Sequence, residues 1–238
     1  MSVTMQPIYV LASGGSRAME QLDVQANNLA NVNTPGFKKV LMTEMSQAAP
    51  KTEAAAADRL VFPRFSESVV LQQQGAMIKT GAANDLALSG SGYFEVLRED
   101  ETVLTRQGKT HLDDQGYLLD DHENFFLDTK GEPVLLDKAL PYTVTEEGAV
   151  YQENALRATL GIRAFESVSA SGEHYYRPQG NEITADATVR QGFVEASNLN
   201  ATEGMISLIE AQRRFEIYGN LIRSLDQLEQ KANEIGRA

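Results

Sequence analysis

The sequence has no cysteine and no tryptophan, and it has only three histidines in 238 residues. Without cysteine the chain cannot form disulfides, thiolate metal sites or a cysteine nucleophile. The histidines, His111, His122 and His174, stand in none of the short spacings that place zinc ligands on one helix face. We therefore expect no catalytic residues, no cofactor and no metal ion.

Long apolar runs and basic clusters are also missing. Nowhere do eighteen apolar residues follow one another, so the sequence predicts no transmembrane helix. Residues 1–12 lack the basic start and the continuous apolar block of a cleaved signal peptide. Residues 41–200 carry thirteen basic and twenty-five acidic side chains, whereas the two ends of the chain are nearly neutral. Because no basic patch exists, nucleic acid and anionic membranes are not expected as partners.

The sequence does contain an apolar repeat of seven residues at each end. Alternating spacings of three and four predict helices over residues 4–33 and from about residue 200 to 235, each with a stripe that packs on another helix. Gly14 and Gly15 indicate either a kink or the close approach of a partner helix. We interpret the stripes as an assembly seam, formed by Met5, Ile8, Ala12, Gly15, Met19, Leu22, Ala26, Leu29, Leu208, Ala211, Phe215, Tyr218, Ile222 and Leu225.

The ends of both predicted helices are marked. The first helix stops at Asn31-Val32-Asn33-Thr34-Pro35-Gly36-Phe37, because Asn tolerates the left-handed conformation and the residue before Pro35 disfavours the helical one. The second helix starts at Asn200, which with Glu203 three residues later has the pattern of a capping box.

The middle of the chain predicts β structure. Over residues 85–170 short apolar runs alternate with turn-forming segments such as Asp128-Thr129-Lys130-Gly131, which is typical of a compact antiparallel domain. Residues 40–71 lack clear periodicity, and the Ala-rich residues 47–57 are typical of a linker. The predicted fold class is therefore α+β, with long N- and C-terminal helices forming a coiled-coil layer and a central antiparallel β-rich domain.

Acidic residues in the predicted β domain are the main candidates for chemistry. The group Asp113, Asp114, Asp120, Asp121 and Glu123 lacks the alternating oxygen ligands of a calcium loop, so we interpret it as solvated hairpin turns. A pair of catalytic carboxylates stays open, because the separation of such a pair is a property of the fold. Two alternatives follow: a dimeric enzyme with Asp/Glu chemistry in the β domain, and a regulatory coiled-coil adaptor.

Three segments resemble the signatures of the rod and hook proteins of the bacterial flagellum. Residues 26–38, which read Ala-Asn-Asn-Leu-Ala-Asn-Val-Asn-Thr-Pro-Gly-Phe-Lys, resemble the N-terminal signature of that family. Residues 85–94 with Thr105-Arg106-Gln107-Gly108 resemble the core of its first globular domain, and residues 190–200 resemble its C-terminal signature. With this length and one modest β domain, the chain is most similar to proximal-rod subunits and next to distal-rod subunits. The run Asn84-Asp85-Leu86-Ala87-Leu88 departs from the Arg-Pro-Leu-Asp-Val run common in relatives.

The resemblance implies a structural subunit of the basal-body rod, without enzymatic activity, that assembles helically and transmits torque from the motor to the hook. Its partners would be itself, other proximal- and distal-rod subunits and, in transit, the flagellar type III export apparatus. It would reach the periplasmic rod without a cleaved signal peptide, and neither nucleic-acid binding nor membrane insertion is implied.

The resemblance also implies a division of the chain and roles for the first signature. The expected domains are the N-terminal helix and turn of the axial core at 1–36, an extended linker at 37–84, a β-rich outer domain at 85–187, and the C-terminal helix of the axial core at 188–238. Pro35 and Gly36 would redirect the chain outward, and Phe37 would anchor the turn in an apolar pocket. The helix end would be capped by Asn27, Asn28, Asn31 and Asn33, which would also hydrogen-bond neighbouring backbone.

Overall fold

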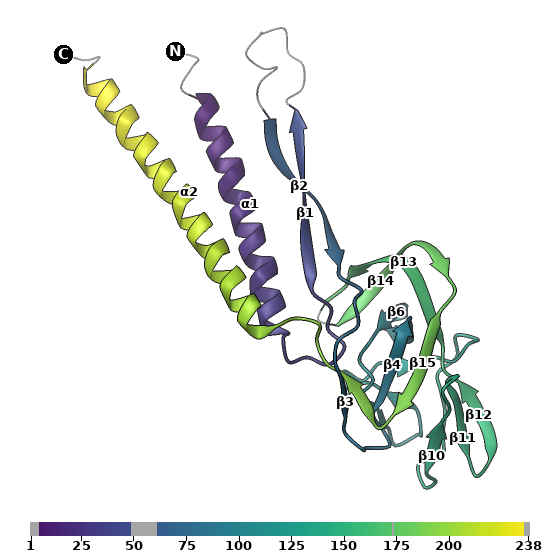
Figure 1. The fold of residues 1–238 in the computed structure, drawn as a ribbon. Helices are drawn as coiled ribbons and strands as arrows, with labels where there is room; N and C mark the ends of the chain where they lie inside the picture. The colour runs from purple at the N-terminus through teal and green to yellow at the C-terminus, as the bar shows by residue number, and fades with distance from the viewer. Residues whose placement is uncertain (1–4, 49–60, 173, 236–238) are drawn as a thin grey trace. The chain divides into compact units, whose positions relative to one another are not determined.

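The computed structural model describes residues 5–48, 61–172 and 174–235. Two helices and sixteen strands follow one another in this part of the chain (Figure 1). Their bounds are α1 Met5–Ala30, β1 Val40–Ala48, β2 Val61–Val70, β3 Met77–Lys79, β4 Leu86–Ser91, β5 Tyr93–Arg98, β6 Glu101–Thr105, β7 His111–Leu112, β8 Leu118–Leu119, β9 Phe125–Phe126, β10 Tyr142–Val144, β11 Ala149–Gln152, β12 Ala155–Thr159, β13 Ile162–Ala170, β14 Tyr175–Ile183, β15 Asp186–Gln191, β16 Phe193–Glu195 and α2 Ala201–Ile235.

The predicted fold class is wrong. The described residues contain only two helices, of 26 and 35 residues, and the structure is β-rich, with a central sheet. Strands β1, β2 and β3 lie within the segment predicted to be a linker. The two helices pack against each other within the chain, and they do not form long coiled-coil layers at both termini. The heptad pattern led to a wrong prediction because it indicates that a helix has an apolar stripe but does not indicate which part of the molecule covers that stripe.

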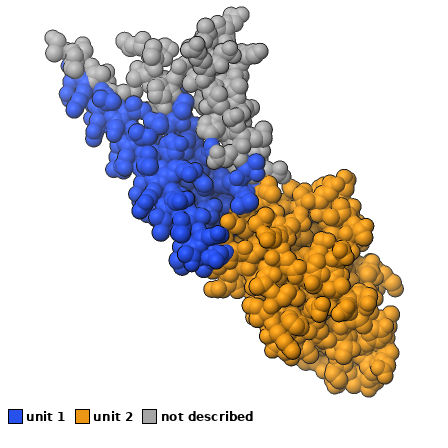
Figure 2. Space-filling model, in the orientation of Figure 1, with its two compact units in different colours: residues 1–30, 41–68, 200–238 blue, residues 31–40, 69–199 orange. Residues whose placement is uncertain are grey.

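The chain divides into two compact units, which Figure 2 shows in different colours. Residues 1–30, 41–68 and 200–238 form the unit that contains α1 and α2, which we call the helical unit. Residues 31–40 and 69–199 form the second unit, which we call the β unit. The first signature turn and the segment that precedes α2 therefore both belong to the β unit.

Within the helical unit, α1 and α2 run antiparallel beside each other (Figure 1). Gly14 faces the ring of Tyr218, and a Cβ added at Gly14 would overlap that ring. At Gly15 an added Cβ would lie 3.7 Å from the Cβ of Tyr218, which is an ordinary contact. Arg214 Nη1 donates a hydrogen bond of 2.9 Å to Gln21 Oε1. Gly14 is thus the position at which the absence of a side chain lets the two helices approach closely.

The start of α2 is capped as the sequence predicts. The side-chain oxygen of Asn200 accepts hydrogen bonds from the backbone N–H groups of Thr202 at 2.9 Å and Glu203 at 3.3 Å. The Glu203 carboxylate also lies in the first turn, where the helix dipole favours negative charge. Neither of the two described helices carries an apolar stretch of the length needed to cross a lipid bilayer.

The β unit is built on a seven-stranded antiparallel sheet with the strand order β13-β14-β6-β5-β9-β8-β7. Strand β13 also pairs with β5, through Ile162 with Phe94 and Arg163 with Tyr93, so β13, β14, β6 and β5 close into a ring. Smaller sheets of β10-β11-β12, β15-β4 and β16-β3 complete the unit. The main core includes Phe94 and Phe126, whose ring centroids lie 5.6 Å apart.

A second, smaller core cluster lies in the same unit. It consists of Val70, Tyr93, Leu104, Val168 and Tyr176, all at most 4% exposed. The rings of Tyr93 and Tyr176 stand 5.4 Å apart at 56°. This cluster adjoins the buried polar groups described next, because the Tyr176 hydroxyl bonds to the backbone of the first signature turn.

Candidate functional site

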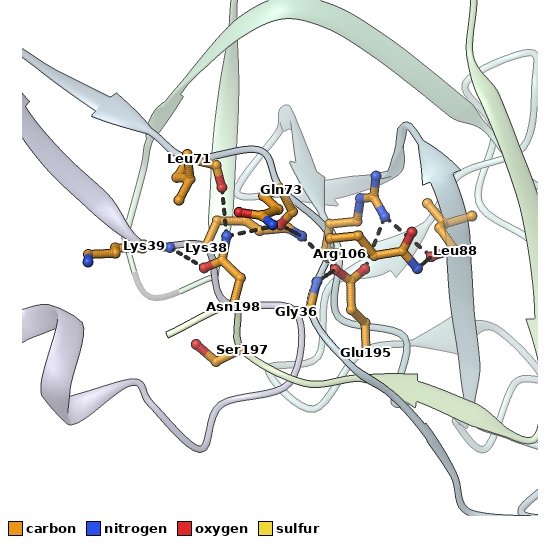
Figure 3. Close-up of polar contacts among 12 residues, drawn as sticks. Gly36, Lys38, Lys39, Leu71, Gln73, Leu88, Arg106, Glu195, Ser197 and Asn198 are labelled. Atoms are coloured by element: carbon orange, nitrogen blue, oxygen red, sulfur yellow. Dashed lines mark hydrogen bonds and ion pairs between the residues drawn. The ribbon is translucent and has the colours of Figure 1, made fainter. Parts of the chain in front are cut away.

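Segments from both ends of the β unit meet at Glu195 (Figure 3). The ammonium of Lys38 lies 2.5 Å from Glu195 Oε1, and Arg106 Nη1 lies 3.0 Å from Glu195 Oε2. All three side chains are at most 3% exposed. We call Lys38, Arg106 and Glu195 the ion triad. Its members come from the end of the first signature turn, the segment after β6, and the end of β16.

Backbone groups complete the surroundings of Lys38 and Glu195. Lys38 Nζ donates a second hydrogen bond of 2.8 Å to the carbonyl oxygen of Gln73. Glu195 Oε1 also accepts the N–H of Gly75 at 2.8 Å, and a Cβ added at Gly75 would overlap the carbonyl oxygen of Ala196. Glycine is therefore required at position 75, where the backbone comes close to the carbonyl of Ala196 while its N–H bonds to the carboxylate.

Arg106 ties the triad to strand β4. Its guanidinium donates to the carbonyl oxygens of Leu88 at 3.3 Å and Gly90 at 2.6 Å. Its Cζ lies 5.2 Å from the centroid of the Tyr93 ring, within the range of a cation–π contact. One arginine therefore connects Glu195 to the carbonyls of a strand and to the second core cluster.

The triad holds two cations against one carboxylate, so its net charge is +1 when all three groups are ionised. Burial of the ammonium lowers the pKa of Lys38, while the charge of Glu195 and its hydrogen bond act in the opposite direction. Removal of the carboxylate would leave two buried cations without a counter-charge. Glu195 is thus the member on which the stability of the triad depends most.

A parallel set of hydrogen bonds joins the same segments through Asn198. Its side-chain oxygen accepts the N–H of Lys39 at 2.7 Å, and its amide donates to the carbonyls of Leu71 at 2.8 Å and Gln73 at 2.9 Å. The N–H of Gly36 donates to the carbonyl oxygen of Glu195 at 2.8 Å. Figure 3 shows these contacts around Lys38 and Glu195. Residues 36–39 and residues 71–73 are therefore both held beside residues 195–198.

Two buried tyrosines near the triad differ in their hydrogen bonds. The Tyr176 hydroxyl accepts the N–H of Lys38 at 2.7 Å and donates to the carbonyl of Gly36 at 3.3 Å. The Tyr93 hydroxyl has no hydrogen-bond partner among the described residues. Burial raises the pKa of both phenols, that of Tyr93 to about 12. Both hydroxyls therefore stay protonated at neutral pH, but only one of them holds the signature turn.

This difference predicts opposite outcomes for two matched substitutions. Tyr176→Phe should lower the free energy of unfolding by about 1–3 kcal/mol, because it removes a hydroxyl and leaves the Lys38 N–H unpaired. Tyr93→Phe should leave stability unchanged or raise it, because the hydroxyl that it removes is buried without a partner. Urea unfolding followed by far-UV circular dichroism measures both, and equal losses in the two variants would contradict the assignment.

The structure places the residues of the first signature as follows. Asn28 and Phe37 are buried, and Gly36 is buried with a φ of +73°. Thr34 bonds back to Asn31 through both its N–H and its hydroxyl, each at 3.1 Å. Asn31 and Pro35 are half-buried, and Asn27 and Asn33 are exposed. The capping and anchoring roles implied by the resemblance stay predictions.

The residues of the predicted assembly seam differ in exposure. Ala211 is buried, whereas Ala12, Met19, Ala26 and Phe215 are exposed. On α1 the buried positions include Gly14 and Ala18, each one residue before a predicted seam position. The side chains of Met5 and Ile8 lie outside the described residues. The half-buried seam residues are Gly15, Leu22, Leu29, Leu208, Tyr218, Ile222 and Leu225.

The ion triad was not predicted from the sequence. A signal was present, because each of its members is a charged residue inside one of the three segments that carry the family resemblance. A second group of side chains that the sequence did not bring together is Asp121, His122 and His174, which could hold a metal ion. One expected solvated carboxylate, Asp120, is instead fully buried.

Comparison with known proteins places both ends of the chain in one family. The family model described as "Flagella basal body rod protein" matches residues 8–38, and the model described as "Flagellar basal body rod FlgEFG protein C-terminal" matches residues 190–235. Lys38 lies at the end of the first match and Glu195 lies within the second. The segments that the two models recognise are therefore in direct contact through the triad.

Relatives with this family name align over nearly the whole chain. The flagellar basal-body rod protein FlgF of Caulobacter vibrioides is 31% identical over 235 residues, covering 95% of this chain and 96% of the relative. FlgG of Bacillus subtilis is 28% identical over 263 residues, covering 98% and 100%. FlgF of Mesorhizobium japonicum is 28% identical over 230 residues, covering 91% of each. The prediction of the family from the signature segments is confirmed, and the chain belongs to the flagellar basal-body rod protein family.

Proposed function

We propose that this chain is a structural subunit of the proximal rod of the bacterial flagellar basal body. In this role it assembles helically with copies of itself and with other rod subunits, and it transmits torque from the motor to the hook. One observation carries the proposal. The two segments that match rod-family models are bound to each other by a buried ion triad, so the parts of the chain that identify the family also hold each other in place in the β unit.

We take FlgF as the proximal-rod and FlgG as the distal-rod member of the family, and on this basis the alignments favour a proximal-rod subunit. The Caulobacter FlgF alignment spans 235 residues, close to the length of this chain. The Bacillus subtilis FlgG alignment spans 263, more than the 238 residues of the chain, so it requires insertions. A distal-rod subunit of the same family is the second candidate.

Exposed apolar side chains on the helices supply contacts for neighbouring subunits. Each would contribute about 1.5–3 kcal/mol if it were fully buried in an assembly. Contacts between different faces of identical copies, when they do not close, build an open helix, which is the symmetry that a rod requires. Among the helix residues whose side chains the structure describes, the exposed large apolar ones are Tyr9, Met19, Met205, Ile206, Ile209, Phe215, Ile217, Leu221 and Leu228.

The proposal includes the route and the setting of assembly. The subunit is exported by the flagellar type III apparatus, and it assembles in the periplasm without catalytic activity. The chain has no cysteine, so this route would not require a disulfide to form after export. The names of the matched relatives, which describe rod proteins, support a structural role.

A charge placed on the exposed face of α2 tests the proposal. Ile217 is 57% exposed, so Ile217→Asp should leave the subunit folded but place a charge in a contact between copies. We expect loss of swimming in soft agar, and loss of the subunit from purified basal bodies, when the variant is the only copy in the cell. Gln227→Asp, at an exposed polar position of the same helix, is the control and should swim normally. Normal swimming of the Ile217→Asp strain would contradict the proposed contact.

A further inference from the structure

Two turns of the β unit bring potential metal ligands together. Asp121 and His122 lie in the turn between β8 and β9, and His174 directly precedes β14. One ligand atom from each of the three side chains lies within 4.8 Å of the other two. The rings of His122 and His174 have centroids 5.0 Å apart, and His122 Nδ1 lies 3.0 Å from Asp121 Oδ1. The fold thus assembles a group that no spacing in the sequence indicates.

The backbone around this group is held in place by Asp120. Its Oδ1 accepts the N–H groups of His122 and Asn124, both at 2.9 Å. Its Oδ2 accepts the hydroxyl of Tyr175 at 2.6 Å. Because Asp120 is fully buried and bonded to both segments, it locks the turn that carries His122 onto the strand that follows His174. The backbones of the ligand group are therefore positioned before any ion binds.

Distances and exposure are compatible with coordination of one ion. Ligands at about 2.0–2.1 Å from a tetrahedral zinc ion stand about 3.3 Å apart. Asp121 and His122 are about half-exposed and can rotate inward by the small amount required, whereas the buried His174 provides a fixed ligand. A cavity of about 310 Å³ beside His122, lined also by Arg98, Asn124 and Tyr175, has room for a water molecule as a fourth ligand.

The charge and the chemistry of the group favour a transition metal. The carboxylate of Asp121 belongs to the group, that of Asp120 bonds to the backbone of His122, and Arg98 and Glu99 both line the cavity beside it. A divalent cation is thus added to a locally negative site. Two imidazole nitrogens and one carboxylate suit zinc and its neighbours, whereas calcium and magnesium require oxygen ligands.

We propose that Asp121, His122 and His174 bind one divalent transition-metal ion of the zinc class, which clips the β8–β9 turn to the start of β14. The role is structural: the ion cross-links two turns of the β unit that are far apart in sequence. An ion that binds the folded chain but not the unfolded chain raises the free energy of unfolding. The increase grows with the logarithm of the free metal concentration.

Zinc chloride is the probe for this site, added to the full-length chain after treatment with EDTA. Isothermal titration calorimetry should give one equivalent of bound zinc, and thermal unfolding should show a raised melting temperature when zinc is present. Calcium chloride and magnesium chloride should give neither effect. Cobalt chloride should produce the visible absorption of a bound ion. His122→Gln and Asp121→Asn should each weaken zinc binding by at least about tenfold, because each removes a direct ligand.

His111→Gln is the matched control, since His111 is equally exposed but pairs with Glu123 at 3.5 Å and lies outside the group. It should leave zinc affinity unchanged. His174→Gln should abolish binding, and circular dichroism checks that this buried variant folds; if it does not, the two exposed variants decide alone. Zinc affinity that is unaffected by His122→Gln, or that is reduced equally by His111→Gln, would overturn the proposal, as would binding of calcium as tight as that of zinc.

Discussion

Replacement of Glu195 by glutamine is expected to lower the free energy of unfolding by about 3–5 kcal/mol, the usual cost of removing one partner of a buried ion pair. The variant keeps the size of the side chain, but it leaves Lys38 and Arg106 buried without a negative charge. The new amide also points an N–H group at the Arg106 guanidinium. Urea unfolding followed by tyrosine fluorescence measures the loss, since the chain has no tryptophan. Cells that rely on this variant should not swim.

Two further variants show whether charge balance is the cause. Lys38→Met leaves Glu195 and Arg106 as a neutral pair, so it should cost clearly less than the Glu195→Gln change. Glu101→Gln removes an ion pair with Arg177, 2.6 Å long, between two half-exposed side chains, and should hardly change stability. If Lys38→Met proves as costly as Glu195→Gln, loss of packing explains the result better than uncompensated charge.

The second large effect is expected at Gly36, in the first signature turn. Its φ of +73° is unfavourable for any residue with a side chain, and a Cβ at this position would overlap the backbone nitrogen of Gln107 and lie 2.5 Å from the carbonyl carbon of Arg106. Gly36→Ala should therefore cost about 1–2 kcal/mol for the backbone conformation and about 1–3 kcal/mol more for the overlap. The same urea titration measures the loss, and swimming should fail.

Gly81 offers a matched control that separates the cost of the steric overlap from the cost of the backbone conformation. Its φ of +74° is nearly the same, but a Cβ there meets nothing within 4 Å among the described residues. Gly81→Ala should therefore show the conformational cost alone, and swimming should persist. If the two alanine variants lose the same stability, the close approach of residues 106 and 107 to the signature turn is not a constraint on the chain.

The sequence predicted those elements whose signals are local. The α2 N-cap follows from the side-chain chemistry of Asn200 and from Glu203 three residues later. The antiparallel strands of residues 85–170 follow from alternating apolar runs and turns. Such features depend on neighbours a few residues away, which a single sequence displays.

What the sequence could not predict depends on contacts between distant segments. The heptad stripes did not reveal that α1 and α2 cover each other, which is why the predicted fold class was wrong. The triad joins residues 38, 106 and 195, and although each lies in a segment that carries the family resemblance, the sequence does not show that the three side chains are in contact. Nor does the sequence show that His122 and His174 lie close together. The four predicted domain limits and the assembly seam stay predictions.

The side-by-side attachment of residues 71–73 and 195–198 has a consequence for how such chains diversify. The segment between them, residues 74–194, leaves and returns at one neck within the β unit, so its size can change while its two anchor points keep their spacing. The entropy of closing a longer loop grows only with the logarithm of its length. The 263-residue alignment with Bacillus subtilis FlgG, against 238 residues here, is the kind of difference that a neck of this sort tolerates.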